Sequence, residues 1–272
     1  MKEKKHYNNN QHLYGFLNGV RMNDAGEGRT AINMQVVTLE NYKKDGQSVT
    51  NRTYHDAVLF TGNKELIKKF EGIAADLEAN KDAEKKTTHT VSLDGILKSK
   101  DRDLQVIVRE DSLAVDTKQA ENEVRNRAEL SGNIASVTLH EEQNFASVLV
   151  VNHFRPKDSD KEFETAVNIN VSGDRKFSKE TYEALKKGEM GVGDFIRVSG
   201  QMHNNNYTKG ETKVYGMVLD ANSTELLYKK GEKVAEKAEQ KVEKKPEKKP
   251  AKAAAAEAKP KKAASRKKGQ TL

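Results

Sequence analysis

The sequence predicts a mainly β protein in which two copies of a small barrel domain, each with one helix, precede a disordered C-terminal tail. Three observations favour this fold class. Strand-like segments dominate residues 12–228, the same order of elements occurs twice, and residues 229–272 contain almost no large apolar side chains. The repeat is considered first because overlooking an internal repeat leads to the wrong fold.

The first copy contains five predicted strands and one helix. Apolar and polar residues alternate in its strands, as expected where one face of each strand is buried. The period changes over residues 63–80, where Leu66, Phe70, Ile73 and Leu77 have helical spacing. The predicted strands are residues 13–17, 31–37, 53–60, 88–95 and 104–108.

The second copy repeats this order. Its helix is predicted over residues 178–187, with Ser178 as the N-cap and Gly188 as the stop. Gly15 and Gly132 occupy the same place in the first strand of each copy, where a strand bends or another backbone comes close. The predicted strands of the second copy are residues 130–134, 146–151, 163–171, 194–200 and 212–218.

Three strands, a helix and two strands is the element order of the OB fold, a five-stranded Greek-key barrel that binds oligonucleotides or oligosaccharides. A different small α+β domain, duplicated, would share part of this pattern. The predicted boundaries are a flexible N-terminus over 1–11, OB-fold domain 1 over 12–116, a linker over 117–127, OB-fold domain 2 over 128–228 and the tail over 229–272.

The positive charge of the chain belongs to the tail. Residues 229–272 hold 16 Lys or Arg and 6 Glu, whereas residues 1–228 hold 32 basic and 35 acidic residues. A segment of Lys, Ala, Glu and Pro has too little to bury to offset the entropy of the chain, so it is predicted to be disordered. It is either a solubilising linker or a polycation that binds phosphates, and the block of like charge favours the second interpretation.

Composition and motifs argue against several classes of protein. The chain has no Cys, no apolar run long enough to span a bilayer and no apolar secretion signal, so we expect a soluble cytoplasmic protein. Its seven His show no metal-ligand spacing, and no phosphate-binding Gly-rich loop occurs. The sequence therefore predicts a binding protein with no catalytic residue, cofactor or metal, and not an enzyme.

Two segments resemble the bacterial single-stranded-DNA-binding proteins. Residues 53–70 are similar to that family's third strand and helix, and residues 200–219 to its fourth strand, long hairpin and fifth strand. The resemblance is an ordered series of weak matches over residues 12–116 and 128–228. It implies sequence-tolerant binding and protection of single-stranded DNA during replication, recombination or repair, and hence a cytoplasmic location associated with DNA in the nucleoid.

In that family aromatic side chains stack on bases, and nearby cations contact phosphates. Tyr42, Phe154 and Tyr207 are expected in polar loops, where a core role is hard to arrange, whereas Phe60 is in phase with Val58 and could equally belong to the core. The candidate aromatic residues are Tyr42, Tyr54, Phe60, Phe154, Phe163 and Tyr207. The candidate basic residues are Lys43, Lys44, Arg52, Arg155, Lys157 and Lys209.

The chain also departs from the family pattern. It has no Trp, its second copy has Ile169 where the first has Phe60, its first copy lacks the long last hairpin, and it lacks the acidic C-terminal tip that recruits replication and repair proteins. Single-barrel members work as tetramers, so two barrels per chain imply a homodimer with four OB domains. Two alternatives remain open: an RNA-binding OB protein, and a nucleoid-associated or structural protein that binds DNA mainly through its tail.

Overall fold

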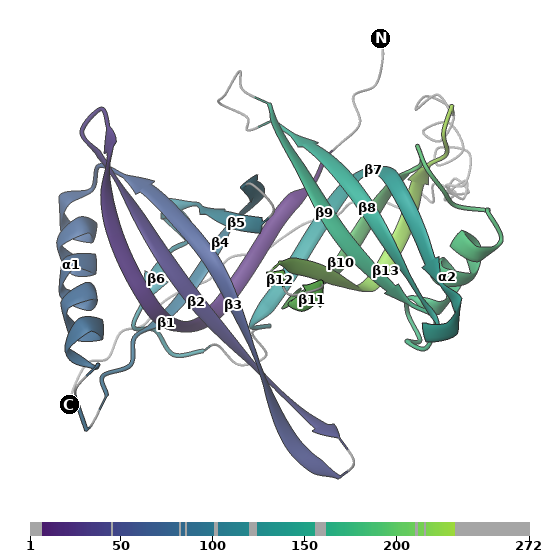
Figure 1. Cartoon of the computed structure of the whole chain (residues 1–272). Coiled ribbons are helices and arrows are strands. Elements are labelled where there is room, and N and C mark those ends of the chain that lie inside the picture. Colours follow the sequence, from purple (N-terminus) through teal and green to yellow (C-terminus); the bar gives the residue numbers. More distant parts are fainter. Residues whose placement is uncertain are drawn as a thin grey trace, which may run out of the picture. The chain divides into compact units, whose positions relative to one another are not determined.

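The computed structural model contains two barrels formed from successive parts of the chain (Figure 1). It describes residues 7–44, 46–81, 83–84, 86–100, 103–119, 124–155, 162–209, 212–214 and 216–231. Lys157 and nearly all of the basic tail therefore lie outside the described residues.

The first barrel has five main strands and one long helix. Its β2–β3 strands are longer than the barrel requires and continue as a two-stranded arm (Figure 1). The elements are β1 (Asn9–Gly26), β2 (Arg29–Lys44), β3 (Gln47–Thr61), α1 (Lys64–Ala79), β4 (Thr90–Lys100) and β5 (Asp103–Val108), followed by the short η1 (Glu110–Ser112) and β6 (Ala114–Val115).

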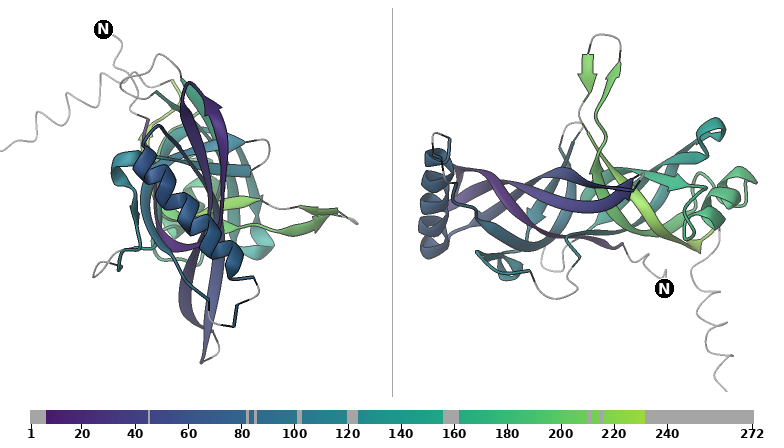
Figure 2. Two further views of the ribbon diagram at one scale, coloured as in Figure 1. Left: turned by 90° about the vertical axis from the view of Figure 1, so that its left-hand side faces the viewer. Right: turned by 90° about the horizontal axis from the view of Figure 1, so that it is seen from below.

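The second barrel repeats this plan with a shorter helix. A small hairpin projects from between its last two strands (Figure 2). The elements are β7 (Asn126–His140), η2 (Glu141–Gln143), β8 (Phe145–Phe154), β9 (Phe163–Ser172), α2 (Lys179–Lys186), β10 (Phe195–Asn204), β11 (Tyr207–Lys209), β12 (Thr212–Val214) and β13 (Met217–Tyr228).

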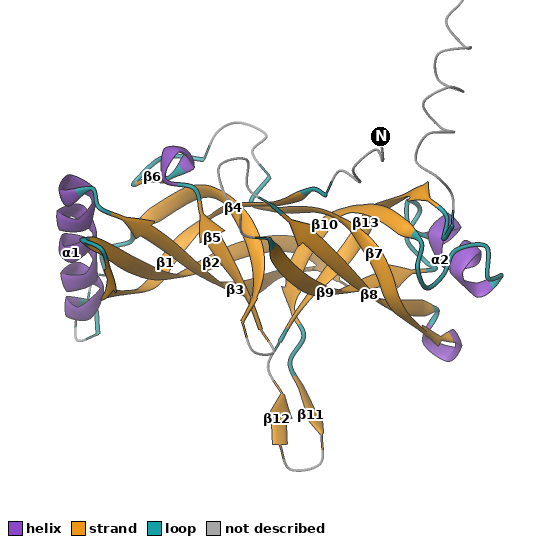
Figure 3. Cartoon of the chain, turned by 90° about the horizontal axis from the view of Figure 1, so that it is seen from above, coloured by secondary structure: helices purple, strands orange, loops and turns teal. Residues whose placement is uncertain are grey.

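Both barrels close in the same strand order. In the first, β1 pairs with β2 and β4, β3 pairs in parallel with β5, and β4 pairs with β5. In the second, β7 pairs with β8 and β10, β9 pairs in parallel with β13, and β10 pairs with β13, while β8 pairs with β9. This closed Greek-key order is that of the OB fold. The predicted fold class, including one helix between the third and fourth strands of each barrel (Figure 3), is confirmed.

Glycines allow the strands to cross closely in both barrels. A Cβ atom on Gly15 would lie 2.4 Å from the backbone oxygen of Val37, and one on Gly132 would lie 2.3 Å from that of Val151. No side chain fits at such a distance, so these strands can coil over one another only where residue 15 or 132 is glycine. Gly15 and Gly132 are therefore equivalent positions, from which the two barrels can be aligned residue by residue.

An antiparallel pairing of β1 with β7 joins the barrels into one eleven-stranded sheet. Asn9 pairs with Leu130, and Leu13 with Asn126, which gives the junction an approximate twofold symmetry. Residues 9–11 therefore belong to β1, although composition alone assigned 1–11 to a flexible terminus. Asn9 can be buried although it is polar, because its side-chain amide is hydrogen-bonded to the backbone of Leu97. The Asn9 amide donates to the Leu97 carbonyl and accepts from the Leu97 N–H, both at 2.8 Å.

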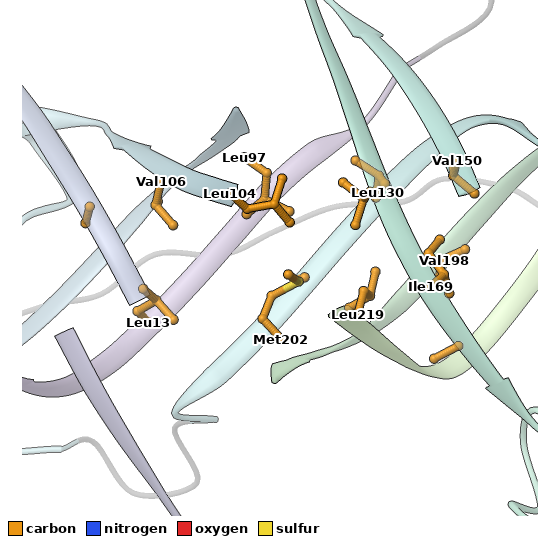
Figure 4. Packing of buried hydrophobic residues seen from close by; sticks show 14 of the residues in the cluster. Leu13, Leu97, Leu104, Val106, Leu130, Val150, Ile169, Val198, Met202 and Leu219 are labelled. Carbon is orange, nitrogen blue, oxygen red and sulfur yellow. The ribbon is translucent and has the colours of Figure 1, made fainter. Parts of the chain in front are cut away.

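The buried side chains of the two barrels form one apolar cluster (Figure 4). Leu13 and Leu97 from the first barrel and Leu130 and Met202 from the second are almost fully covered. Because a single core spans the junction, we expect the barrels to stabilise each other. No helix among the described residues is both long and apolar enough to cross a membrane.

Two elements differ from the sequence prediction. The fifth strand of the second barrel is β13, residues 217–228, and not 212–218, because Thr212–Val214 pairs with Tyr207–Lys209 in the projecting hairpin. The segment around Tyr42, which the sequence analysis expected to be a polar loop, instead forms ladder pairs between β2 and β3 up to Lys44 and Gln47. A two-stranded arm exposed on both faces has no apolar alternation to reveal it.

Candidate nucleic-acid interface

The outer face of β3 carries two exposed aromatic rings. Inward-facing His55, Ala57 and Leu59 are at most 1% exposed, whereas Tyr54 and Phe60 are 41% and 45% exposed. The two rings are six residues apart, an even number that places them on the same face, about 20 Å apart along the strand. Phe60 therefore does not belong to the barrel core.

The ring of Tyr54 lies at a groove beside the second barrel. This groove of about 350 Å³ is lined by Gln35, Tyr54 and Asp56 from the first barrel, and by residues at the base of the projecting hairpin that include Asn204 and Met217. A second hollow of about 630 Å³ shares Gln35 and Asp56 with the first and continues across β2 and β1 to α1. Because the two hollows share Gln35 and Asp56, we treat them together and call them the β3 channel; Tyr54 lines the first hollow, and Phe60 lies farther along the same strand, outside both linings.

Among the described residues, one unpaired cation lines the β3 channel and two more lie near it on β3 and the arm, while Lys81, also in the lining, is paired with Glu78. Arg21 is this unpaired cation, and its backbone pairs in register with Asn33. Arg52 is exposed two residues before Tyr54, hence on the same face of β3, and Lys43 is exposed on the arm. Asp56 is the only acidic side chain between the two rings on that face of the strand. The surface combines stacking platforms with positive charge, as a nucleic-acid groove requires.

The arm carries three more of the predicted residues. Tyr42 lies within β2, opposite Val49 of β3, and not in a loop after the strand as the sequence suggested. Lys43 and Lys44 follow it in β2, Lys44 opposite Gln47. Only the exposed side chain of Lys43 is described, so for Tyr42 and Lys44 the structure gives the position on the strand and no more.

Phe154 and Phe163 have a different environment from Tyr54. They form a cross-strand pair between β8 and β9, both are partly buried, and both are in phase with the inward residues of those strands. The Nζ atom of Lys98 in the first barrel lies 5.4 Å from the centre of the Phe163 ring. Phe154 was expected in a polar loop, whereas it ends β8. Arg155 beside it is exposed.

Tyr207 and Lys209 lie on the first strand of the projecting hairpin, β11, where they pair with Val214 and Thr212. Their backbone positions agree with the predicted hairpin between the last two strands. Their side chains lie outside the described part of the chain.

The register shows which positions of the two barrels are equivalent. Gly15 packs on Val37 and Gly132 on Val151, and Val37 pairs with Tyr54 while Val151 pairs with Ala166. Ala166 is thus the counterpart of Tyr54. Continuing along the ladder, the counterpart of the pair Ala31–Phe60 is the pair Phe145–Ser172.

This register corrects the sequence comparison of Phe60 with Ile169. Ile169 is fully buried and points inward, opposite Val148. Its counterpart is Ala57, because Ala57 and Ile169 pair with Val106 and Leu219, the equivalent residues of the fifth strands. Matching Phe60 to Ile169 is therefore wrong by three positions along the strand.

The sequence analysis missed two aromatic residues of the second barrel. Phe145 stacks on His140, with ring centres 4.3 Å apart. Phe177, in the loop before α2, is 72% exposed. A lone Phe beside Lys176 in a polar stretch was the only signal available for the second of these.

Within the described ranges, no group of three His, Asp or Glu could hold a metal ion. Burial, with a smaller contribution from His203, lowers the pKa of His55 to about 3, so this ring is a neutral core residue that hydrogen-bonds Thr38 at 3.0 Å. The side chains that the site presents are exposed aromatic rings and cations.

Comparisons with known proteins reveal the fold of the chain. No family model matches it, and no curated protein sequence does. Among solved structures, the wild-type single-stranded DNA binding protein from Thermus aquaticus superposes with a TM-score of 0.51 at 14% identity, covering 91% of this chain and 97% of that one. A deletion mutant of the same protein gives 0.51 and 14%, covering 83% and 97%. The match extends over both barrels, so this protein has the tandem arrangement of that structure.

Proposed function

We propose that the protein binds single-stranded DNA without strong sequence preference, and that the β3 channel of the first barrel is its principal binding surface. The observation that supports this most directly is the pair of exposed rings, Tyr54 and Phe60, on one face of β3. Every base has a π-face, so stacking on such rings does not read sequence. Arg21, Arg52 and Lys43 are the proposed phosphate contacts.

The fold supports this proposal by analogy only, since OB barrels bind several kinds of ligand. The solved structures with the same tandem arrangement are of a single-stranded DNA binding protein. A role in replication, recombination or repair is part of the proposal. The remaining predicted contacts, Tyr42, Lys44, Phe154, Arg155, Lys157, Phe163, Tyr207 and Lys209, are retained as secondary proposals, with Phe163 weakest because Lys98 already covers its ring.

The basic tail is the proposed source of additional, sequence-independent affinity. With 16 cations and 6 acidic residues in 229–272, it should add phosphate contacts to any nucleic acid. We also propose that two chains associate into a homodimer with four OB domains. Sedimentation of the full chain tests this, and a mass of one chain at micromolar concentration contradicts it.

A competition experiment tests the main proposal. Labelled oligo-dT is bound to the full chain and to a chain ending at Val234, the end of the compact unit, and fluorescence anisotropy is read against unlabelled oligo-dT, duplex DNA and oligo-U. We expect the shortened chain to retain oligo-dT binding and duplex to compete poorly. If the shortened chain no longer binds oligo-dT, the tail is the DNA-binding part. If oligo-U competes more strongly than oligo-dT, the ligand is RNA.

A further inference from the structure

The loop between β9 and α2, residues 173–178, carries the most exposed large apolar side chain in the described part of the chain, Phe177 at 72%. The Nζ atom of Lys176 lies 5.5 Å from the centre of its ring. Arg175 and Lys179 are also exposed, so three cations flank one ring within five residues. The first barrel has only Gly62 and Asn63 between the equivalent elements, so the feature is specific to the second barrel.

Hydrogen bonds hold this loop in place. The Ser178 hydroxyl donates to the Ser172 carbonyl at 2.7 Å, and the Ser178 N–H donates to the Arg175 carbonyl at 3.1 Å. The side chain of Asn144 donates to Asp174 at 2.6 Å. The backbone on both sides of Phe177 is therefore tied down, and the ring is presented to solvent by a fixed support, which lowers the entropy lost when a ligand binds it.

The loop adjoins the outer face of the second barrel. Ser172 pairs with Phe145, which is the place that Ala31 and Phe60 occupy in the first barrel. Arg175 reaches over β13 to Asp220, with 3.1 Å between Nη2 and Oδ2. The second barrel has Ala166 and Ser172 in place of the two rings on β3, but it carries a ring in the loop that follows.

We propose that Phe177 is a second nucleobase-stacking site, with Lys176 and Lys179 contacting the flanking phosphates, so that a long single strand engages both barrels. This inference rests on the proposed function. The chemistry of the patch favours a nucleic acid over a protein partner, because Lys is depleted in the cores of protein interfaces, whereas a ring surrounded by cations matches a base with its phosphates. Arg175, already paired with Asp220, positions the loop.

The test compares Phe177→Ala with Tyr54→Ala in the full chain, using oligo-dT of about 8 nucleotides, within the span of one OB fold, and of about 40 nucleotides. Phe177→Ala should weaken binding of the long oligonucleotide by about 5- to 150-fold and leave the short one within about twofold. Tyr54→Ala should weaken both. Phe177→Tyr, which keeps the ring, should restore wild-type binding, and Val192→Ala, which trims another exposed apolar residue, should change neither.

A second readout isolates the phosphate contacts. The double variant Lys176→Ala/Lys179→Ala should reduce the slope of log affinity against log salt for the long oligonucleotide by about 1.4, which corresponds to two contacts on a single strand. If Phe177→Ala binds both lengths like the wild type while Tyr54→Ala does not, the second site is wrong and the proposed function stands. If neither variant changes binding, both the Phe177 site and the β3 channel are wrong as binding surfaces, and if the wild-type chain does not bind oligo-dT at all, the proposed function itself fails. If Phe177→Ala changes only self-association, the patch is a protein contact.

Discussion

Replacing Tyr54 by alanine removes the ring that lines the β3 channel and touches little of the barrel core. Tyr54 is 41% exposed, so more than half of its surface is already covered by the protein before any base arrives. A stacked base contributes about 1–3 kcal/mol, and a ring that is already held loses little entropy on binding. We therefore expect about 2 kcal/mol, a decrease in affinity of about 30-fold.

The assay is anisotropy of labelled oligo-dT at several salt concentrations. Because the ring contacts no phosphate, Tyr54→Ala should lower affinity equally at all salts, whereas Arg52→Ala should reduce the salt slope by about 0.7. Tyr54→Phe keeps the ring and should bind within about twofold of the wild type. Ala166→Tyr, which places a ring at the equivalent position of the second barrel, should increase affinity for long oligonucleotides.

Binding of Tyr54→Ala within about twofold of the wild type, with an unchanged melting temperature, would refute the reasoning. The base would then have to contact another surface, and the β3 channel would lose its main support. A large fall in melting temperature would show instead that the exposed ring is part of the fold.

Three further predictions concern stability and pH. Asn126→Ala should lower the free energy of unfolding by about 2–4 kcal/mol, because it leaves the buried N–H and carbonyl of Met202 without their side-chain partner. Urea unfolding measures this loss. The exposed Asn18→Ala is the control and should change the free energy of unfolding by under about 0.5 kcal/mol. Gly132→Ala should lower the free energy of unfolding by about 1–3 kcal/mol, measured in the same way, because its Cβ would meet a backbone oxygen at 2.3 Å. His55 has a pKa of about 3 in the folded protein and 6.5 as its ordinary value, so stability should be complete above about pH 6.5 and decrease by about 1.4 kcal/mol per pH unit below it; a pH series of unfolding on His55→Gln should show a smaller slope.

The order of elements was predictable because each barrel strand has one buried face. Alternation located β3, and helical spacing located α1 to within one residue at each end, since Asn63 and Asn80 are its caps. The arm formed by residues 41–50 was not predictable. None of its described side chains is buried, so its pairing depends on continuing an existing ladder and not on burial.

Which way an aromatic side chain points was also beyond the sequence. The sequence analysis placed Tyr54 and Phe163 near the start of the third strand of each barrel, yet Tyr54 lies in the middle of β3 and faces outward, whereas Phe163 begins β9 in phase with the core. A shift of one residue in register reverses every side chain of a strand. Only the pairing of Val37 with Tyr54 and of Val151 with Ala166 establishes which positions correspond.

The two barrels agree where folding constrains them and differ where it does not. Leu13 and Leu130 fill the same interior place, and Gly15 and Gly132 allow the same close crossing. On the outer face, by contrast, Tyr54 corresponds to Ala166. Packing requires no ring at that position, since the second barrel closes without one, and an exposed aromatic gains little free energy on folding. The exposed rings of the first barrel are therefore not required by its packing, and this supports the binding role proposed for them. The same reasoning applies to Phe177, whose ring is exposed on a loop that its own hydrogen bonds already hold in place.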